Sequence, residues 1–211
     1  MKISQARIAA SLTILCICAA AASAQKKPLD KETLRAADLN GIELGAVLAS
    51  IAADYSVTIG FEAYPNRPQS PIEVHLRDVN YMQFIDGLVR ADRRYQWHEH
   101  DGFIEVLPVN QEISLLETPI ANFQVKDVSR ELALNRLFGL PSVQAQALLM
   151  GLKVRTPLPP AEKPRDEKLS FNLSGVTLRQ ALNLIARDSG ARFWIARKFP
   201  DGTFEIKLSC C

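Results

Sequence analysis

The fold is decided by residues 72–97, which read IEVHLRDVNYMQFIDGLVRADRRYQW. Residues 169–194 read LSFNLSGVTLRQALNLIARDSGARFW and align with the first stretch without a gap. Several aligned positions are identical: Leu76 with Leu173, Val79 with Val176, Gln83 with Gln180, Arg90 with Arg187, and Trp97 with Trp194. Self-similarity over such a length predicts that the chain contains one structural unit twice.

Each copy predicts a strand, then a helix, then a hairpin. Apolar and polar residues alternate over residues 72–77 and 169–173, which is the period of a half-buried strand. Apolar residues then recur at helical spacing, namely Tyr81, Phe84, Ile85 and Leu88 in one copy and Leu178, Ala181, Leu182 and Ile185 in the other. Asp-Gly pairs at residues 101–102 and 201–202 predict tight turns, because both turn residues can adopt positive φ.

Capping patterns mark the start of both repeated helices. Asn80 stands three residues before Gln83, and Thr177 stands three residues before Gln180, so each pair predicts a capping box. The tryptophans fall on the strand after each helix, where a large ring can cover the apolar stripe. The predicted repeat core therefore consists of Trp97, Trp194, Phe84, Leu88, Leu182 and Ile185.

Further elements precede the repeated stretch in each copy. In the first copy we expect a helix capped by Asn40 and Glu43, and a strand over residues 57–61. In the second we expect a strand at residues 123–125, a helix capped by Ser129, an interruption at Pro141, and a further helix capped by Ser142. The sequence thus predicts an α+β fold of two tandem βαββ-type modules, each a small sheet with helices packed on one face.

The chain begins with the pattern of a secretory signal peptide. Lys2 and Arg7 precede an apolar run over residues 8–22, and Ala22-Ser23-Ala24 supplies the small residues of a cleavage site. A retained membrane anchor is the alternative, but the run is alanine-rich and short for a spanning helix. We expect cleavage after Ala24, a periplasmic or secreted mature chain, and no transmembrane segment after signal cleavage.

Predicted boundaries follow from these elements. Residues 1–24 are the signal peptide, 25–37 an N-terminal linker, 38–109 the first module, 110–118 a junction, 119–208 the second, elaborated module, and 209–211 a cysteine tail. Cleavage removes Lys2 and Arg7 from the 25 basic residues, leaving 23 basic against 23 acidic residues. A neutral mature chain argues against a nucleic-acid partner.

The order of predicted elements resembles the short N-terminal domain shared by secretins and TonB-dependent receptors, and the related N-domains of secretins. The residues that carry the resemblance in the first copy are Leu44–Leu48, Ile51, Ala52, Ile59, Phe61, Val74–Leu76, Val79, Phe84, Ile85, Leu88 and Trp97. Residues 176–182, VTLRQAL, carry it in the second, divergent copy. The resemblance implies a non-enzymatic envelope module that binds other proteins, in secretion, pilus assembly or transport signalling.

A small metal-binding protein or a hydrolase is one alternative function. His98 and His100 point to one face of their predicted strand, and His75 lies on a polar face of another, so the three imidazoles are candidate ligands for zinc or copper. An exposed polar face is the simpler interpretation. The sequence lacks the G-x-S-x-G, H-E-x-x-H and phosphate-loop motifs. We therefore expect no enzyme activity, no catalytic residues, no bound metal and no cofactor.

A structural, oligomerising envelope subunit is the other alternative. Cys210 and Cys211 are adjacent at the end of the chain, too close for an unstrained bond to each other. A bridge between two chains would give a homodimer. If the chain instead binds envelope proteins, the open edges of its small sheets predict binding by strand addition.

Overall fold

The protein is described by a computed structural model that covers residues 33–65, 71–110, 114–155 and 168–209. The side chains of residues 33–38 and 81 are outside the description, as are the predicted signal peptide and Cys210 and Cys211. The elements of the first half are β1 (Thr33–Glu43), α1 (Leu44–Asp54), β2 (Thr58–Glu62), β3 (Pro71–Asn80), α2 (Tyr81–Ala91), β4 (Tyr95–His100) and β5 (Phe103–Pro108).

The second half begins with a 3-10 turn, η2 (Leu115–Glu117). It continues with β6 (Pro119–Val128), α3 (Arg130–Phe138), α4 (Pro141–Leu149), β7 (Lys153–Arg155), β8 (Leu169–Thr177), α5 (Leu178–Asp188), β9 (Phe193–Lys198) and β10 (Thr203–Ser209). The predicted α+β class is confirmed. None of the helices in the described ranges has the length and apolar character needed to cross a membrane.

The two aligned stretches have the same local structure. Both α2 and α5 begin with a complete capping box, so the predicted cap residues Asn80, Gln83, Thr177 and Gln180 are confirmed. Just before those caps, the aligned residues Asp78 and Gly175 both have positive φ, at 50° and 65°. The predicted core residues Phe84, Leu88, Leu182, Ile185 and Trp194 are buried, whereas Trp97 is only half-buried.

A six-stranded sheet forms the centre of the molecule, in the order β4-β5-β2-β9-β10-β7. Within each half the hairpin is antiparallel and a third strand adds in parallel, β2 beside β5 and β7 beside β10. The halves are joined by the parallel pairing of β2 with β9. The structure therefore differs from the prediction of two small sheets, because their edges meet and form one sheet.

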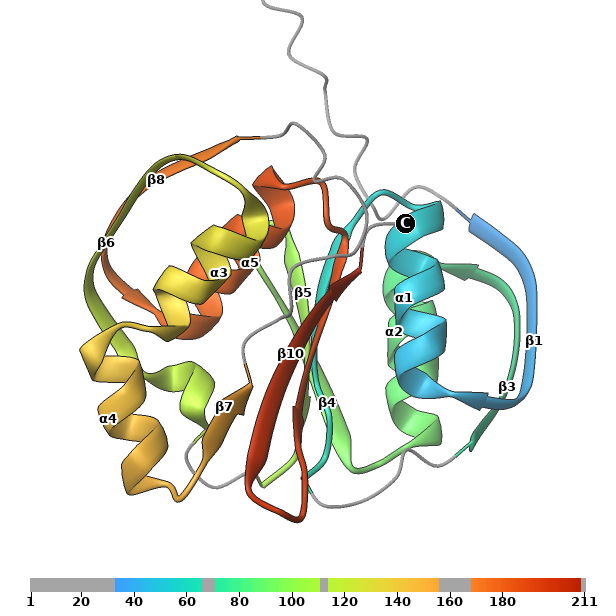
Figure 1. The fold of residues 1–211 in the computed structure, drawn as a ribbon. Helices are drawn as coiled ribbons and strands as arrows, with labels where there is room; N and C mark the ends of the chain where they lie inside the picture. Colours follow the sequence, from blue (N-terminus) through green and yellow to red (C-terminus); the bar gives the residue numbers. More distant parts are fainter. Residues whose placement is uncertain (1–32, 66–70, 111–113, 156–167, 210–211) are drawn as a thin grey trace, which may run out of the picture.

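The helices cover both faces of this sheet (Figure 1). Helices α1 and α2 lie on one face, while α3 and α5 lie on the other, and the strand pairs β1–β3 and β6–β8 form the outer layers. Strand β9 contributes to both cores, with Phe193 and Ile195 in the first and Trp194 and Ala196 in the second. Strand β2 is buried along its whole length because it too lies between the two sets of helices.

Several predicted boundaries and caps are wrong. Strand β1 starts at Thr33, inside the predicted linker, and includes Asn40; α1 has Glu43 as its N-cap without a side-chain cap bond. The helix break predicted at Pro141 is confirmed, since α3 ends at Phe138 and α4 begins at Pro141, but the N-cap of α4 is Leu140 and the predicted Ser142 cap does not exist. Proline suits that first position because its missing N–H would have no partner within the helix.

The two hairpin turns also differ from one another. Asp101 and Gly102 both have positive φ, as the tight-turn prediction requires, but at the second turn only Gly202 does. There the chain contains three additional residues, and the loop closes through a bond from the Phe199 amide to the Thr203 carbonyl, 2.8 Å long.

Candidate functional site

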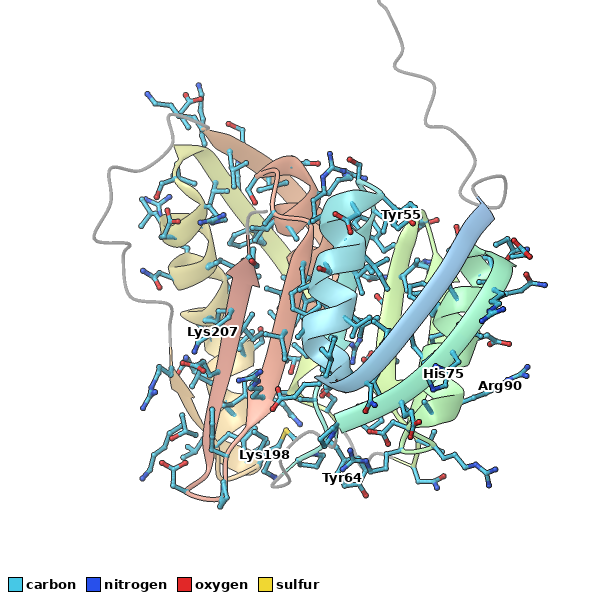
Figure 2. All side chains as sticks on the ribbon, turned by 90° about the vertical axis from the view of Figure 1, so that its right-hand side faces the viewer. Tyr55, Tyr64, His75, Arg90, Lys198 and Lys207 are labelled. Carbon is cyan, nitrogen blue, oxygen red and sulfur yellow. The ribbon has the colours of Figure 1, made fainter. Side chains whose placement is uncertain are left out.

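The structure does not bring the three predicted metal candidates together. His75 lies on β3, which pairs with β1 in an outer layer, whereas His98 and His100 lie on β4 of the central sheet. His75 is exposed and contacts Glu73 at 3.3 Å (Figure 2). Across the described residues, no group of three or more His, Cys, Asp or Glu side chains is placed to hold a metal ion.

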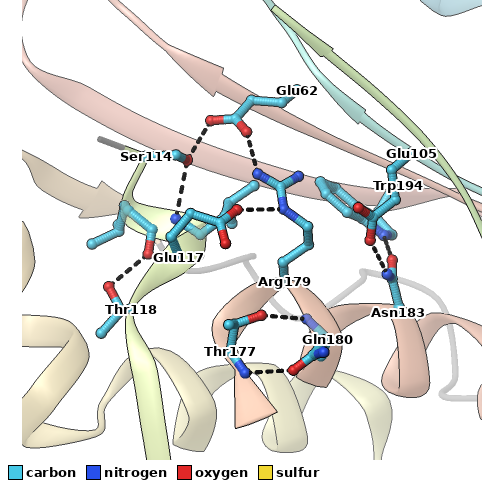
Figure 3. A network of polar contacts seen from close by, with 12 residues as sticks. Glu62, Glu105, Ser114, Glu117, Thr118, Thr177, Arg179, Gln180, Asn183 and Trp194 are labelled. Atoms are coloured by element: carbon cyan, nitrogen blue, oxygen red, sulfur yellow. Dashed lines mark hydrogen bonds and ion pairs between the residues drawn. The ribbon is translucent and has the colours of Figure 1, made fainter. Parts of the chain in front are cut away.

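The most prominent polar feature is instead a buried network at the junction of the two halves (Figure 3). Glu62, the last residue of β2, accepts a hydrogen bond from the Ser114 hydroxyl at 2.5 Å and one from Arg179 at 2.6 Å. Arg179 lies on α5 of the other half, and its Nε donates to Glu117 of η2 at 2.7 Å. One guanidinium therefore joins β2, the connecting segment and α5.

Burial makes this ion pair energetically important. The side chains of Glu62 and Arg179 are 4% and 7% exposed. Burial alone lowers the pKa of Arg179, but the charge of Glu62 and the hydrogen bonds to both carboxylates outweigh that effect and raise the pKa above its usual value. Arg179 stays cationic, and it neutralises a carboxylate that would otherwise be buried alone. Its Nη1 atom has no hydrogen-bond partner among the described atoms.

A second group of contacts extends the junction along α5. The Trp194 indole N–H donates to Asn183 Oδ1 at 2.7 Å, and the Asn183 amide donates to Glu105 Oε1 on β5 at 2.6 Å. One turn further on, the Arg187 guanidinium lies 5.5 Å from the centre of the Phe103 ring. Helix α5 thus presents a row of side chains, four residues apart, to the sheet of the first half.

Glycine is required where Trp194 meets β2. Gly60 pairs with Trp194 in the parallel ladder. A Cβ atom at Gly60 would lie 2.3 Å from one indole carbon and 2.5 Å from another, far inside van der Waals contact. The indole ring therefore approaches the backbone of the neighbouring strand so closely that only glycine fits at this position.

A cleft of 720 Å³ opens beside this network. Its walls include Glu62, Tyr64, Ser114, Leu152, Lys198 and Phe204, which come from both halves and from the connecting segment. At its rim the Tyr95 hydroxyl accepts a bond from the Tyr64 amide at 2.9 Å, and burial raises the pKa of Tyr95. Since Glu62 is held by Arg179 and Ser114, its carboxylate is committed to the junction rather than to the cleft.

The first half contains the counterpart of this junction at the outer edge of the sheet. Trp97 on β4 donates its indole N–H to Asp86 Oδ1 at 2.8 Å, as Trp194 does to Asn183. By the repeat, Met82, Asp86 and Arg90 on α2 stand where Arg179, Asn183 and Arg187 stand on α5. Among the described strands, β4 pairs only with β5. We call β4, together with Met82, Asp86 and Arg90 of α2, the open edge.

Sequence reasoning found the tryptophans and the caps but missed Glu62, Ser114, Glu117 and Arg179. The available signal was a departure from the repeat, because Arg179 replaces an apolar methionine on an otherwise similar helix. A charged residue at that aligned position indicates a contact that the other copy does not make.

Comparison of the chain with protein-family models, with curated proteins and with solved structures finds no match.

Proposed function

We propose that this chain is an exported, non-catalytic protein-interaction module of the bacterial cell envelope, similar to the N-domains of secretins and TonB-dependent receptors, and that it receives a partner strand at the open edge. Its role would belong to secretion, pilus assembly or transport signalling. The single observation that supports this proposal most strongly is the pairing of β2 with β9, because β9 is the repeat counterpart of β4.

The internal pairing demonstrates how such an edge is filled. The Ile59 amide donates to the Arg192 carbonyl at 2.8 Å, and the Ala63 amide donates to the Ala196 carbonyl at 2.9 Å. The repeat counterparts of Arg192 and Ala196 are Tyr95 and Glu99 on β4. Their backbone groups stand in the position to accept a strand, which is an established mode of peptide recognition.

The open edge is also accessible to a partner. Gln96, His98, Glu99 and His100 are all exposed. Edge strands of monomeric proteins are commonly protected by charge, by bulges or by a covering element. Glu99 supplies one acidic group at this edge, and the regular six-residue pairing of β4 with β5 contains no bulge.

Site-specific photo-crosslinking in cells that export the protein tests this proposal. A benzophenone amino acid at Gln96 or His98 should give adducts with an envelope protein. The same group at Ala145, an exposed position on α4, should not. Adducts of similar yield from all three positions, or none from β4, would contradict strand addition at this edge.

The same preparation tests the envelope location. The exported chain should begin at Gln25, as read by N-terminal sequencing. A chain that keeps residues 1–24 and stays in the cytoplasm would contradict that part of the proposal.

A further inference from the structure

We infer that the open edge selects a strand from a different protein, running parallel to β4, with glycine opposite Trp97. This inference rests on the proposed function and specifies the partner's chemistry.

The internal junction supplies the template for the incoming strand. Strand β2 runs parallel to β9 and places Gly60 opposite Trp194. The indole occupies the space of a side chain at that position, since a Cβ there would approach it to 2.3 Å. Residues on either side of the glycine, Ile59 and Phe61, are fully buried in the core of the half that supplies the strand.

Trp97 is held in the same way before any partner binds. Its indole N–H is fixed by Asp86 on α2, eleven residues earlier, and Trp194 is fixed by Asn183 at the same separation. The two rings differ in burial because β2 lies under Trp194, whereas no described strand lies beside Trp97. The half-exposed ring is thus oriented to cover the backbone of a strand that pairs with β4.

Steric fit at the open edge argues against a second copy of this chain as the occupant. In the first half Gly60 pairs with Glu105, and the same register in the second half pairs Arg155 with Glu205. Arg155 would therefore stand opposite Trp97, where the ring leaves no room for a side chain.

The polar groups at the two junctions also differ. Asn183 donates to Glu105 at the internal junction, whereas its counterpart Asp86 has no N–H to donate, accepts from Trp97 at 2.8 Å and pairs with Arg90 at 2.9 Å. A strand that places a hydrogen-bond donor such as lysine or asparagine near Asp86 therefore fits this edge. The choice of a different protein over a second copy rests on the position of Arg155 opposite Trp97.

A peptide titration tests the glycine requirement. The probe is the chain's own β2 segment, residues 57–64, VTIGFEAY, and its control is the same peptide with alanine for glycine. Each is added to isotope-labelled mature chain while the Trp97 indole and the Glu99 amide are followed by NMR. The glycine peptide should shift both signals. The alanine peptide should bind about tenfold more weakly, because its methyl group would overpack against the indole.

The variant Trp97→Ala completes the test. Without the indole, the two peptides should bind within about twofold of each other, because the ring that excludes the methyl group is gone. The comparison of the two peptides on the unaltered chain stands even if this variant folds poorly.

The outcomes separate this inference from the proposed function. Equal binding of both peptides to the unaltered chain overturns the glycine requirement and leaves strand addition in place. Failure of both peptides to shift β4 signals overturns the inference, whereas the proposed function is decided by the crosslinks from Gln96 and His98. Crosslinks from those positions to another copy of this chain would overturn the choice of a different protein.

Discussion

Replacing Arg179 with methionine, the residue at the aligned position of the first half, should lower the free energy of unfolding by about 3–5 kcal/mol. The loss arises because the Glu62 carboxylate, 4% exposed, would remain buried without its cationic partner. Urea unfolding of the protein measures the change. The Ser114 hydroxyl still donates to Glu62, but a neutral donor compensates only part of a buried charge.

Two further variants make this prediction specific. Met82→Ala alters the matching position on α2, away from the junction, and should cost no more than about 1 kcal/mol. Combining Arg179→Met with Glu62→Leu should recover most of the loss, since neither charge then remains buried. A double variant as unstable as Arg179→Met would show that the ion pair is not the source of the effect.

The two tryptophans should respond very differently to the same substitution. Trp194→Ala removes a side chain that is 0% exposed and should cost about 3–5 kcal/mol. Trp97→Ala removes a half-buried ring at the sheet edge and should cost about 1–2 kcal/mol, because folding removes less apolar surface of Trp97 than of Trp194 from contact with water. Thermal or urea unfolding of both variants provides the comparison. Equal losses would mean that Trp97 is already covered as Trp194 is.

Local structure could be predicted well from this sequence. The capping boxes of α2 and α5, the buried stripes and the first hairpin turn depend on residues within a few positions of one another. Such patterns are decided by helix periodicity and turn chemistry. The cap predicted at Asn40 is wrong because a long-range interaction, the pairing of β1 with β3, keeps that residue in a strand.

The junction could not be predicted in the same way. The segment around Gly60 reads as an apolar strand, but its period does not say which strand lies beside it. Its partner β9 lies more than 130 residues further along the chain. The hypothesis that the three histidines lie together on one sheet face is wrong for the same reason. Alternation gives the direction of each side chain but not the sheet to which its strand belongs. Pairing over such separations is set by the packing of whole elements.

Amide hydrogen exchange of the protein tests most directly whether the β2–β9 pairing exists and whether its counterpart at β4 is empty. The amides of Ile59 and Ala63, which donate to β9, should exchange slowly. The amides of Trp97 and Glu99, which the repeat places toward the open edge, should exchange rapidly in the chain alone. Rapid exchange at Ile59 and Ala63, or strong protection at Trp97 and Glu99 without a partner, would contradict the structure of the junction and the open edge.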